Sequence, residues 1–219
     1  MMGKLKKLTG YRLFLPLSCL IIVLLINLIT TPTFFRITIN NGVLYGYIID
    51  VINRASELVV LAVGMTLVVS ASAGTDISVG AVMAVAAAVC TRVLAGGEVS
   101  VNEYANPYVL AVLAALAAAV VCGGFNGLLV AKLKIQPMVA TLILFTAGRG
   151  ISQLVTNGQI TYIRVDGYKL LGNNIPGIPI PTPIFVAVIV VALTYILLKK
   201  TAMGMYIQSV GINERASRL

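Results

Sequence analysis

Apolar residues follow one another along this chain in long unbroken runs, without the alternation of a half-buried strand. Six runs approach the roughly 20 residues that an α-helix needs to cross a hydrocarbon core about 30 Å thick. They cover residues 13–29, 58–73, 77–95, 108–131, 138–155 and 183–198. The runs also lack the two-residue period of an outer-membrane barrel strand. The pattern therefore predicts an all-α, polytopic membrane protein whose transmembrane domain spans residues 13–198.

Basic residues before the first run resemble the start of a signal peptide. However, this run of 17 residues is followed by Thr30-Thr31-Pro32 and not by a small-residue cleavage site. We therefore expect an uncleaved first helix, with residues 1–12 in the cytoplasm. In that orientation ten Lys and Arg residues fall on the cytoplasmic side and five on the outer side, while Arg149 lies within a span. This excess agrees with the positive-inside rule.

The composition excludes a soluble fold and several kinds of enzyme. Hydrophobic residues make up 59% of the 219 residues and charged residues 11%, against about a quarter charged in soluble domains. The absence of histidine excludes histidine-based catalysis and histidine metal sites. Cys19, Cys90 and Cys122 lie in separate apolar runs without CxxC spacing, so we expect packing roles for them. In a membrane chain the net charge of +9 indicates cytoplasmic loops beside anionic lipid, not nucleic-acid binding.

The segment 43–57 is half apolar and carries three charges. On a helix Asp50, Arg54 and Glu57 fall within about 60° of one another. Three interpretations are open: an interfacial helix, a helix that extends the second span towards a water-filled cavity, and a surface ladder of mutually neutralising charges.

The segment GTDISVG at 74–80 places a carboxylate at the start of an apolar helix. Asp76 can accept free backbone N–H groups there, and it lies at the positive end of the helix dipole. A capping role is the structural interpretation. The functional interpretation is a broken helix that lines a substrate path, as in transporters. Both roles are compatible.

Two further segments carry polar residues inside apolar runs. Gly123 and Gly127 form a GxxxG face, for which close helix packing is the expected role. Asn126 is expected to form a hydrogen bond between helices, with a cavity contact as the alternative. Arg149 lies between two glycines and needs a carboxylate, carbonyl groups or water. An ion pair, with Asp76 or Glu57 as conceivable partners, and a direct ligand contact are both open.

Residues 199–219 follow the last run on the cytoplasmic side. Asn213 can cap a short polar helix that carries Glu214, Arg215 and Arg218. A solvated tail and a cytoplasmic docking helix are both compatible with this pattern.

Four motifs, taken in order, resemble one family. Residues 54–56 with 61–69 are similar to its second-helix signature, and GTDISVG is similar to its GIDLSVG pattern, with Thr75 in place of Ile. KIQPMVATL at 134–142 is similar to the start of its fifth helix, and GINERASR at 211–218 to its cytoplasmic coupling loop, G-x-N-x-x-A-x-R. The family is the permease subunits of bacterial monosaccharide ABC importers, the ribose, xylose and galactose group. Within it, KIQPMVATLIL, AGRGISQL and KTAMGMYIQSVGIN are most similar to galactofuranose permeases.

The resemblance implies a transport subunit and not an enzyme. Two permease subunits, identical or different, would form the pathway in the bacterial inner membrane. An extracytoplasmic sugar-binding protein would deliver the monosaccharide, and ABC ATPase subunits would bind inside. ATP would act through that partner, because the chain has no GxxxxGK[ST] phosphate loop; no cofactor or metal is expected in the chain itself. The implied ATPase-coupling residues are Gly211, Asn213, Glu214, Arg215, Ala216 and Arg218. The candidate polar contacts along the pathway or within the structure are Asn53, Arg54, Asp76, Ser78, Asn126 and Arg149.

Members of that family have roughly ten helices in inverted repeats. This sequence stops at Leu219, within the coupling motif, so we expect a fragment or a truncated product. The alternative function is an ion-coupled secondary transporter, which requires carboxylates at mid-membrane; only Asp76 is a candidate. An intramembrane enzyme has little support, because the spans contain no convincing Ser/Lys or paired Asp constellation.

Overall fold

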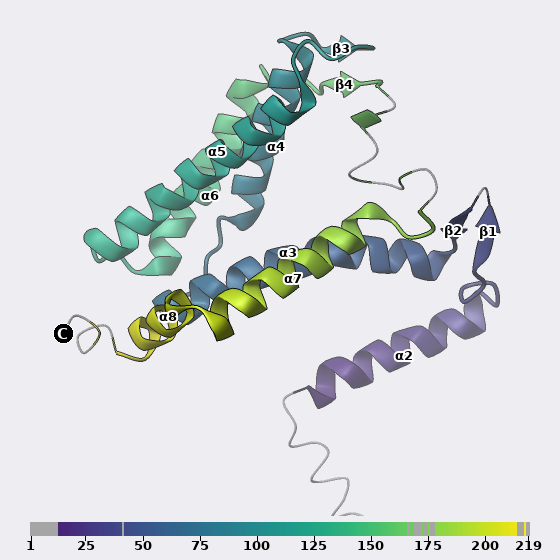
Figure 1. The fold of residues 1–219 in the computed structure, drawn as a ribbon, viewed down its shortest axis with the longest axis horizontal. Helices are drawn as coiled ribbons and strands as arrows, with labels where there is room; N and C mark the ends of the chain where they lie inside the picture. Colours follow the sequence, from purple (N-terminus) through teal and green to yellow (C-terminus); the bar gives the residue numbers. More distant parts are fainter. Residues whose placement is uncertain are drawn as a thin grey trace, which may run out of the picture. The chain divides into compact units, whose positions relative to one another are not determined.

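The structure is a computed structural model that describes residues 13–40, 42–165, 167–168, 172, 175, 178–213 and 217. Figure 1 shows the order of its helices and strands. They are α2 (Phe14–Thr30), β1 (Thr38–Asn40), β2 (Val43–Tyr45), α3 (Tyr47–Ser72), α4 (Val79–Ala95), β3 (Ser100–Val101), α5 (Tyr108–Gly127), the π-helix η1 (Leu128–Lys132), α6 (Pro137–Val155), β4 (Tyr162–Ile163), α7 (Thr182–Lys200) and α8 (Ala202–Ile212). The strands are only two or three residues long, so the predicted helical fold class is confirmed.

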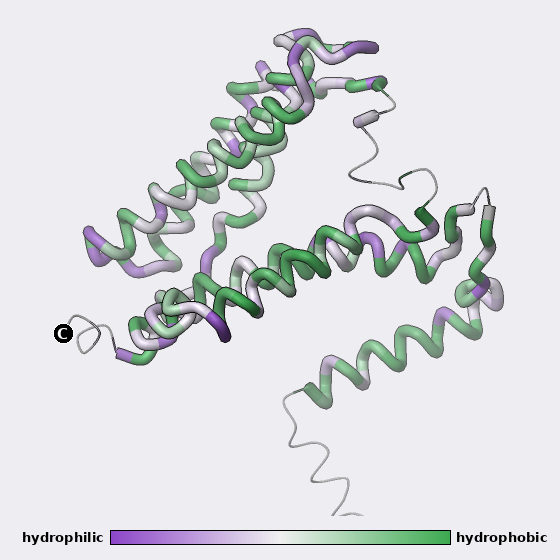
Figure 2. The backbone as a smooth tube through the Cα atoms, in the orientation of Figure 1, coloured by the Kyte–Doolittle hydropathy of each residue, from purple (hydrophilic) through white to green (hydrophobic). Residues whose placement is uncertain are grey.

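Each of the six predicted apolar runs lies in a helix apart from one or two end residues, and the run 108–131 continues from α5 into η1. Among the described residues, α3, α5 with η1, α6 and α7 are long and apolar enough to cross a membrane. The helices α2 and α4 are also apolar and have 17 residues each, the lower end of the range for a transmembrane helix. Figure 2 shows hydrophobic residues along all of these helices. The chain is a multi-pass helical membrane protein.

The ambiguous segment 43–57 divides between two elements. Its first residues form β2, and from Tyr47 onwards it is the first part of α3. With 26 residues at 1.5 Å each, α3 is about 39 Å long and exceeds a hydrocarbon core of about 30 Å. Asp50, Arg54 and Glu57 are all exposed. The charged segment therefore extends the second apolar helix and is not a separate interfacial helix.

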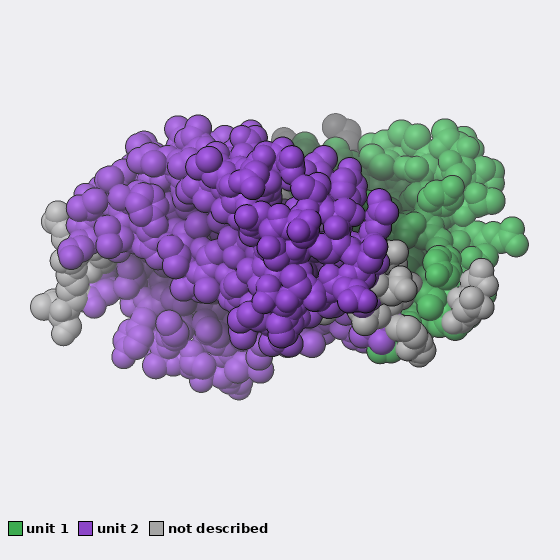
Figure 3. Space-filling view, turned by 90° about the horizontal axis from the view of Figure 1, so that it is seen from above, with its two compact units in different colours: residues 1–55, 176–180 green, residues 56–175, 181–219 purple. Residues whose placement is uncertain are grey.

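The chain divides into two compact units, coloured separately in Figure 3, and each is described by itself. The first unit comprises residues 1–55 and 176–180. In it β1 and β2 form an antiparallel hairpin, and the Leu44 N–H donates to the Pro179 carbonyl at 3.0 Å. Asn53 and Arg54, on α3, belong to this unit.

In the second unit, residues 56–175 and 181–219, α4 packs against both α5 and α6. Small residues make the contact between α4 and α6. Ala81 of α4 is buried, as are Ala140 and Gly148 of α6. A Cβ atom at Gly148 would lie 3.1 Å from the Cβ atom of Ala81, so the two helices approach closely there. Beyond the ends of α4 and α6, β3 and β4 pair in parallel and tie the two following segments together.

Within the part of the chain that the structure describes, the two glycines of the GxxxG face on α5 do not make the predicted close helix contact. Gly123 and Gly127 are exposed. No atom of the described chain outside this helix and the neighbouring residues lies within 4 Å of a Cβ atom built at either glycine. The buried residues of α5 are instead Ala111 and Asn126. Close helix approaches in this unit are made instead at Gly148 of α6 and at Gly211 of α8.

The segment after α7 begins with a helix that the apolar pattern did not predict. The break between α7 and α8 is at Thr201, whose φ of −121° and ψ of 155° are extended. Gly204 is buried in the first turn of α8, where a Cβ atom would overlap the Leu198 carbonyl. Asn213 is the C-cap residue of α8, and its carbonyl also accepts the Ser217 N–H at 3.1 Å. Glu214, Arg215 and Arg218 of the short polar helix predicted after Asn213 lie outside the described residues.

Candidate functional site

The break between α3 and α4 is held in place by the start of α6. The chain leaves α3 at Ala73, whose φ of 51° is left-handed. Gly74 lies against Pro137, because a Cβ atom at Gly74 would be 2.5 Å from the Pro137 Cβ and Cγ atoms. Further along, the Ile77 N–H donates to the Thr141 Oγ1 atom at 3.1 Å. Two residues of α6 thus fix the extended segment that carries Asp76.

The carboxylate of Asp76 is anchored by Ser78 through a single oxygen. Its Oδ1 atom accepts the Ser78 backbone N–H at 2.7 Å and the Ser78 hydroxyl at 2.6 Å. Ser78 is the N-cap residue of α4 and is completely buried. Asp76 therefore accepts a backbone N–H near the helix start, as the capping interpretation predicted, but through an Asx turn to the N-cap residue.

Asn126 extends this cluster across the helix packing. Its Nδ2 atom donates to the Ser78 Oγ atom at 2.8 Å, which is the predicted bond between helices. Asn126 is only 7% exposed, and its Oδ1 atom is buried without a hydrogen-bond partner among the described residues. We call the chain of bonds from Asn126 through Ser78 to Asp76 the polar relay. It joins α5 to the break before α4.

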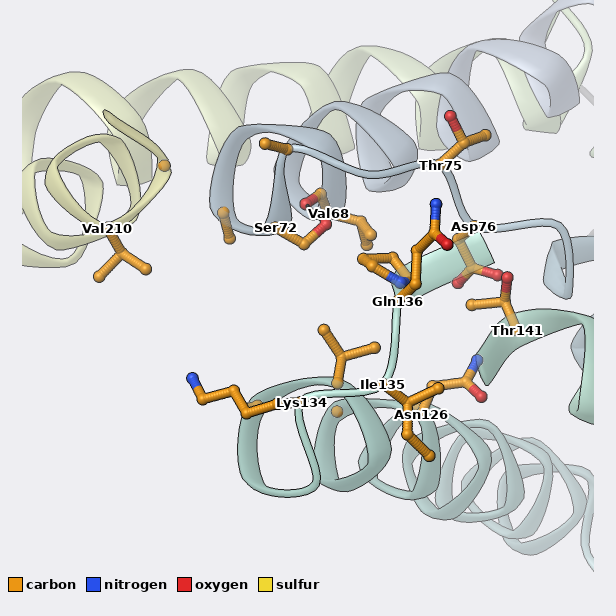
Figure 4. Close-up of a pocket in the computed structure, with 18 of the residues that line it drawn as sticks. Val68, Ser72, Thr75, Asp76, Asn126, Lys134, Ile135, Gln136, Thr141 and Val210 are labelled. Atoms are coloured by element: carbon orange, nitrogen blue, oxygen red, sulfur yellow. Dashed lines mark hydrogen bonds between the residues drawn. The ribbon is translucent and has the colours of Figure 1, made fainter. Parts of the chain in front are cut away.

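A cavity of about 730 Å³ lies next to the polar relay (Figure 4). This volume is typical of small-molecule sites. Asp76 and Asn126 line it, whereas Ser78 is not part of the lining. The lining residues are Val68, Ala71, Ser72, Ala73, Thr75, Asp76, Gly123, Asn126, Gly127, Val130, Ala131, Lys134, Ile135, Gln136, Pro137, Thr141, Val210, Gly211 and Ile212. The walls therefore come from the ends of α3, α5 with η1, and α8, from the start of α6, and from the segments 73–76 and 134–136 that precede α4 and α6.

Several polar lining residues were not singled out from the sequence as site residues. Thr75 comes from the GTDISVG segment, and Lys134, Gln136 and Thr141 come from KIQPMVATL. Both motifs carried the family resemblance, so the sequence contained a signal for these positions but not for their role. The π-helix η1 directly follows Gly127, and π-helical turns are frequent at functional sites.

The other predicted site residues are not brought into the polar relay. The Arg149 guanidinium lies over the Phe145 ring, 4.5 Å from its centroid, and has no ion pair within the described part of the chain. Gly211 lines the cavity, and a Cβ atom there would overlap the Ser70 carbonyl. The structure does not describe the predicted coupling residues Glu214, Arg215, Ala216 and Arg218. Among the residues that it does describe, no group of three Cys, Asp or Glu side chains could hold a metal ion.

Comparison with known proteins gives a consistent set of relatives. A family model described as "Branched-chain amino acid transport system / permease component" matches residues 47–219. A galactofuranose transporter permease of Escherichia coli K12 is 44% identical over 202 residues, which are 92% of this chain and 56% of the relative. A fructose import permease of Bifidobacterium longum is 38% identical, over 98% of this chain and 59% of the relative. A ribose import permease of E. coli K12 is 33% identical, over 92% of this chain and 59% of the relative. No solved structure matches the chain.

The chain spans somewhat more than half the length of these curated relatives. The matched region nevertheless includes the whole polar relay and every residue that lines the cavity.

Proposed function

The chain belongs to this family of transport-system permease components, and from that premise we propose that it forms part of the translocation pathway of an ATP-driven monosaccharide importer. The family description refers to branched-chain amino acids, whereas three similar relatives are named for galactofuranose, fructose and ribose. The 44% identity to the galactofuranose permease favours galactofuranose as the substrate.

One observation carries this proposal: a carboxylate, held at a helix break, lines a cavity of about 730 Å³ among apolar helices. Acidic residues among apolar membrane helices are rare, and such residues mark substrate paths. Discontinuous helices at such positions are a common feature of transporter sites. The ion-coupled alternative has less support, because Asp76 is the only acidic residue among the described residues that line the cavity.

The proposed assembly follows from the importer assignment. The chain lies in the bacterial inner membrane with its N-terminus in the cytoplasm and pairs with a second permease subunit. An extracytoplasmic binding protein delivers the sugar. ABC ATPase subunits bind the segment from Gly211 to Arg218. These subunits bind and hydrolyse ATP, and this chain itself binds no cofactor. The chain itself is a transport subunit and not an enzyme.

The test is co-purification with the ATPase subunit. The permease is produced with ATPase and binding-protein subunits from its own genome, and each partner is quantified after affinity purification. We expect Glu214→Lys or Arg215→Glu to abolish recovery of the ATPase. The control Arg164→Glu, placed on the outer side by the predicted orientation, should leave recovery unchanged. If the wild type recovers no ATPase, or takes up leucine but no monosaccharide, the proposed function is wrong.

A further inference from the structure

The direction of every bond in the polar relay is fixed by the chemistry of its members. An ionised carboxylate has no hydrogen to donate, so the 2.6 Å contact requires the Ser78 hydroxyl to be the donor. The Ser78 oxygen is then an acceptor for Asn126, so the amide nitrogen must face Ser78. The Asn126 Oδ1 atom is turned away from Ser78 as a consequence.

This arrangement leaves one carboxylate oxygen of Asp76 for another partner. Oδ1 accepts two hydrogen bonds, whereas Oδ2 accepts none from the described residues. Asp76 is half-buried and lines the cavity, as its place in Figure 4 shows. The relay therefore fixes the side chain through one oxygen and leaves the other as an acceptor with a defined direction.

Burial of the Asn126 amide costs free energy, and packing alone does not explain why an amide occupies this position. Asn126 is more than nine-tenths buried, and its Oδ1 atom has no partner within the described chain. A buried acceptor without a partner is unfavourable, and an apolar side chain of similar size would avoid that penalty. The bond from Nδ2 to Ser78 is the interaction that the amide provides in return.

The lining also restricts the kind of ligand that Asp76 meets. Among the described residues, Asp76 and Lys134 are the only acidic and basic members of the lining, and their charges balance. A metal cation requires several oxygen ligands, often more than one carboxylate, and the lining residues that the structure describes include a single carboxylate. A neutral molecule with several hydroxyl donors suits one carboxylate oxygen surrounded by amide, hydroxyl and apolar groups.

We propose that Ser78 and Asn126 are positioning residues, which hold Asp76 so that its Oδ2 atom accepts hydroxyl hydrogens of a neutral polyhydroxyl molecule in the cavity. This inference rests on the proposed function and assigns different roles to residues of one cluster. Asp76 contacts the transported molecule. Ser78 and Asn126 act only through Asp76.

The test uses the permease assembled with its ATPase and binding protein in vesicles, and measures sugar molecules taken up per ATP hydrolysed. Asn126→Leu replaces the amide by an apolar side chain of similar size. It should lower this ratio about tenfold, because the loss of the Asn126–Ser78 bond affects the bond from Ser78 to the charged Asp76. The ATPase rate and the amount of assembled complex should remain at the wild-type level. Asn106→Leu is the matched control, because the Asn106 amide also makes one 2.8 Å bond, to the Val93 carbonyl. It should leave the ratio unchanged.

The decisive comparison is made in the Asp76→Asn background. If Asn126 acts through Asp76, Asn126→Leu should have no further effect on the ratio once Asp76 is replaced. Independent multiplicative losses, or a wild-type ratio in Asn126→Leu, would overturn the inference. If Asn126→Leu fails to assemble, Ser78→Ala is tested in the same two backgrounds with the same expected result.

A second readout does not depend on transport. The chain has three aspartates, so carboxyl-labelled aspartate gives few infrared bands, and Asp76→Asn identifies the band of Asp76. We expect Asn126→Leu to shift that band and Asn106→Leu to leave it in place. An unshifted band would overturn the relay. If the band shifts but the wild type takes up no monosaccharide, the polar relay exists, whereas its role in transport and the proposed function are both wrong.

Discussion

Gly148 of α6 provides a direct test of the packing that supports the cavity. A Cβ atom at this position would lie 3.1 Å from the Cβ atom and 3.5 Å from the carbonyl oxygen of Ala81. Ala81 is itself buried at the start of α4, three residues after Ser78. Gly148→Ala must therefore push α4 and α6 apart by a few tenths of an ångström. Gly150, on the same helix, is exposed, and a Cβ atom there would meet nothing within 4 Å.

Two opposing terms set the magnitude. Replacing a helical glycine by alanine favours the helix by about 1 kcal/mol, whereas overpacking a tight contact costs about 1–3 kcal/mol. Gly150→Ala has only the first term, so it should stabilise the protein by up to about 1 kcal/mol. Gly148→Ala has both terms. The free energies of unfolding of the two variants should therefore differ by about 1–3 kcal/mol, with Gly148→Ala the less stable.

The assay is unfolding of the purified protein in mixed micelles by increasing SDS, followed by circular dichroism. The matched pair cancels the helix propensity term, because both variants replace glycine by alanine on α6. A double-mutant cycle then tests the contact itself: Gly148→Ala should cost less in the Ala81→Gly background, by most of the overpacking term. Equal midpoints for Gly148→Ala and Gly150→Ala, or no coupling to Ala81, would refute the reasoning.

Three other outcomes can be measured with the same unfolding assay. Gly74→Ala should destabilise the protein by about 1–3 kcal/mol because the new Cβ atom would meet the Pro137 ring, whereas Gly80→Ala in the same motif has open space and should be neutral or stabilising. Ala73→Gly should stabilise the protein by up to about 1 kcal/mol, because glycine adopts the left-handed φ of 51° without strain. Burial raises the pKa of Tyr168, so the folded protein keeps this proton when the unfolded chain loses it near pH 10. Stability should therefore fall as the pH rises above about 10, and Tyr168→Phe should lose this part of the pH dependence.

The six apolar helices could be predicted from sequence because each coincides with a run of apolar residues. The signal is local, and no packing partner is needed to detect it. α8 could not be predicted in this way. Its start depends on the extended backbone of Thr201 and on the close approach of Gly204 to the Leu198 carbonyl. Such contacts depend on the path of the chain in space, which composition and periodicity do not record.

The site could be predicted only as separate residues. Asp76 and Asn126 attract attention because each is polar within apolar sequence, but 48 residues separate Asn126 from Ser78. Only the packing of α5 against α4 brings them together. The same limitation explains Arg149, for which an ion pair with Asp76 was one expectation. Asp76 accepts a hydrogen bond from Ser78, and the Arg149 guanidinium lies over the Phe145 ring, one turn away on the same helix.

The glycines of α5 show why a correct motif can have a different role from the expected one. A GxxxG sequence indicates a helix face without bulk, and close packing is only one use of such a face. Gly123 and Gly127 line the cavity beside Asn126, and side chains added at either position would enter open space. The absent side chains therefore leave volume next to the polar relay. In the described part of the chain these small residues therefore border the cavity, whereas Gly148 and Ala81 make a close contact between two other helices, α6 and α4.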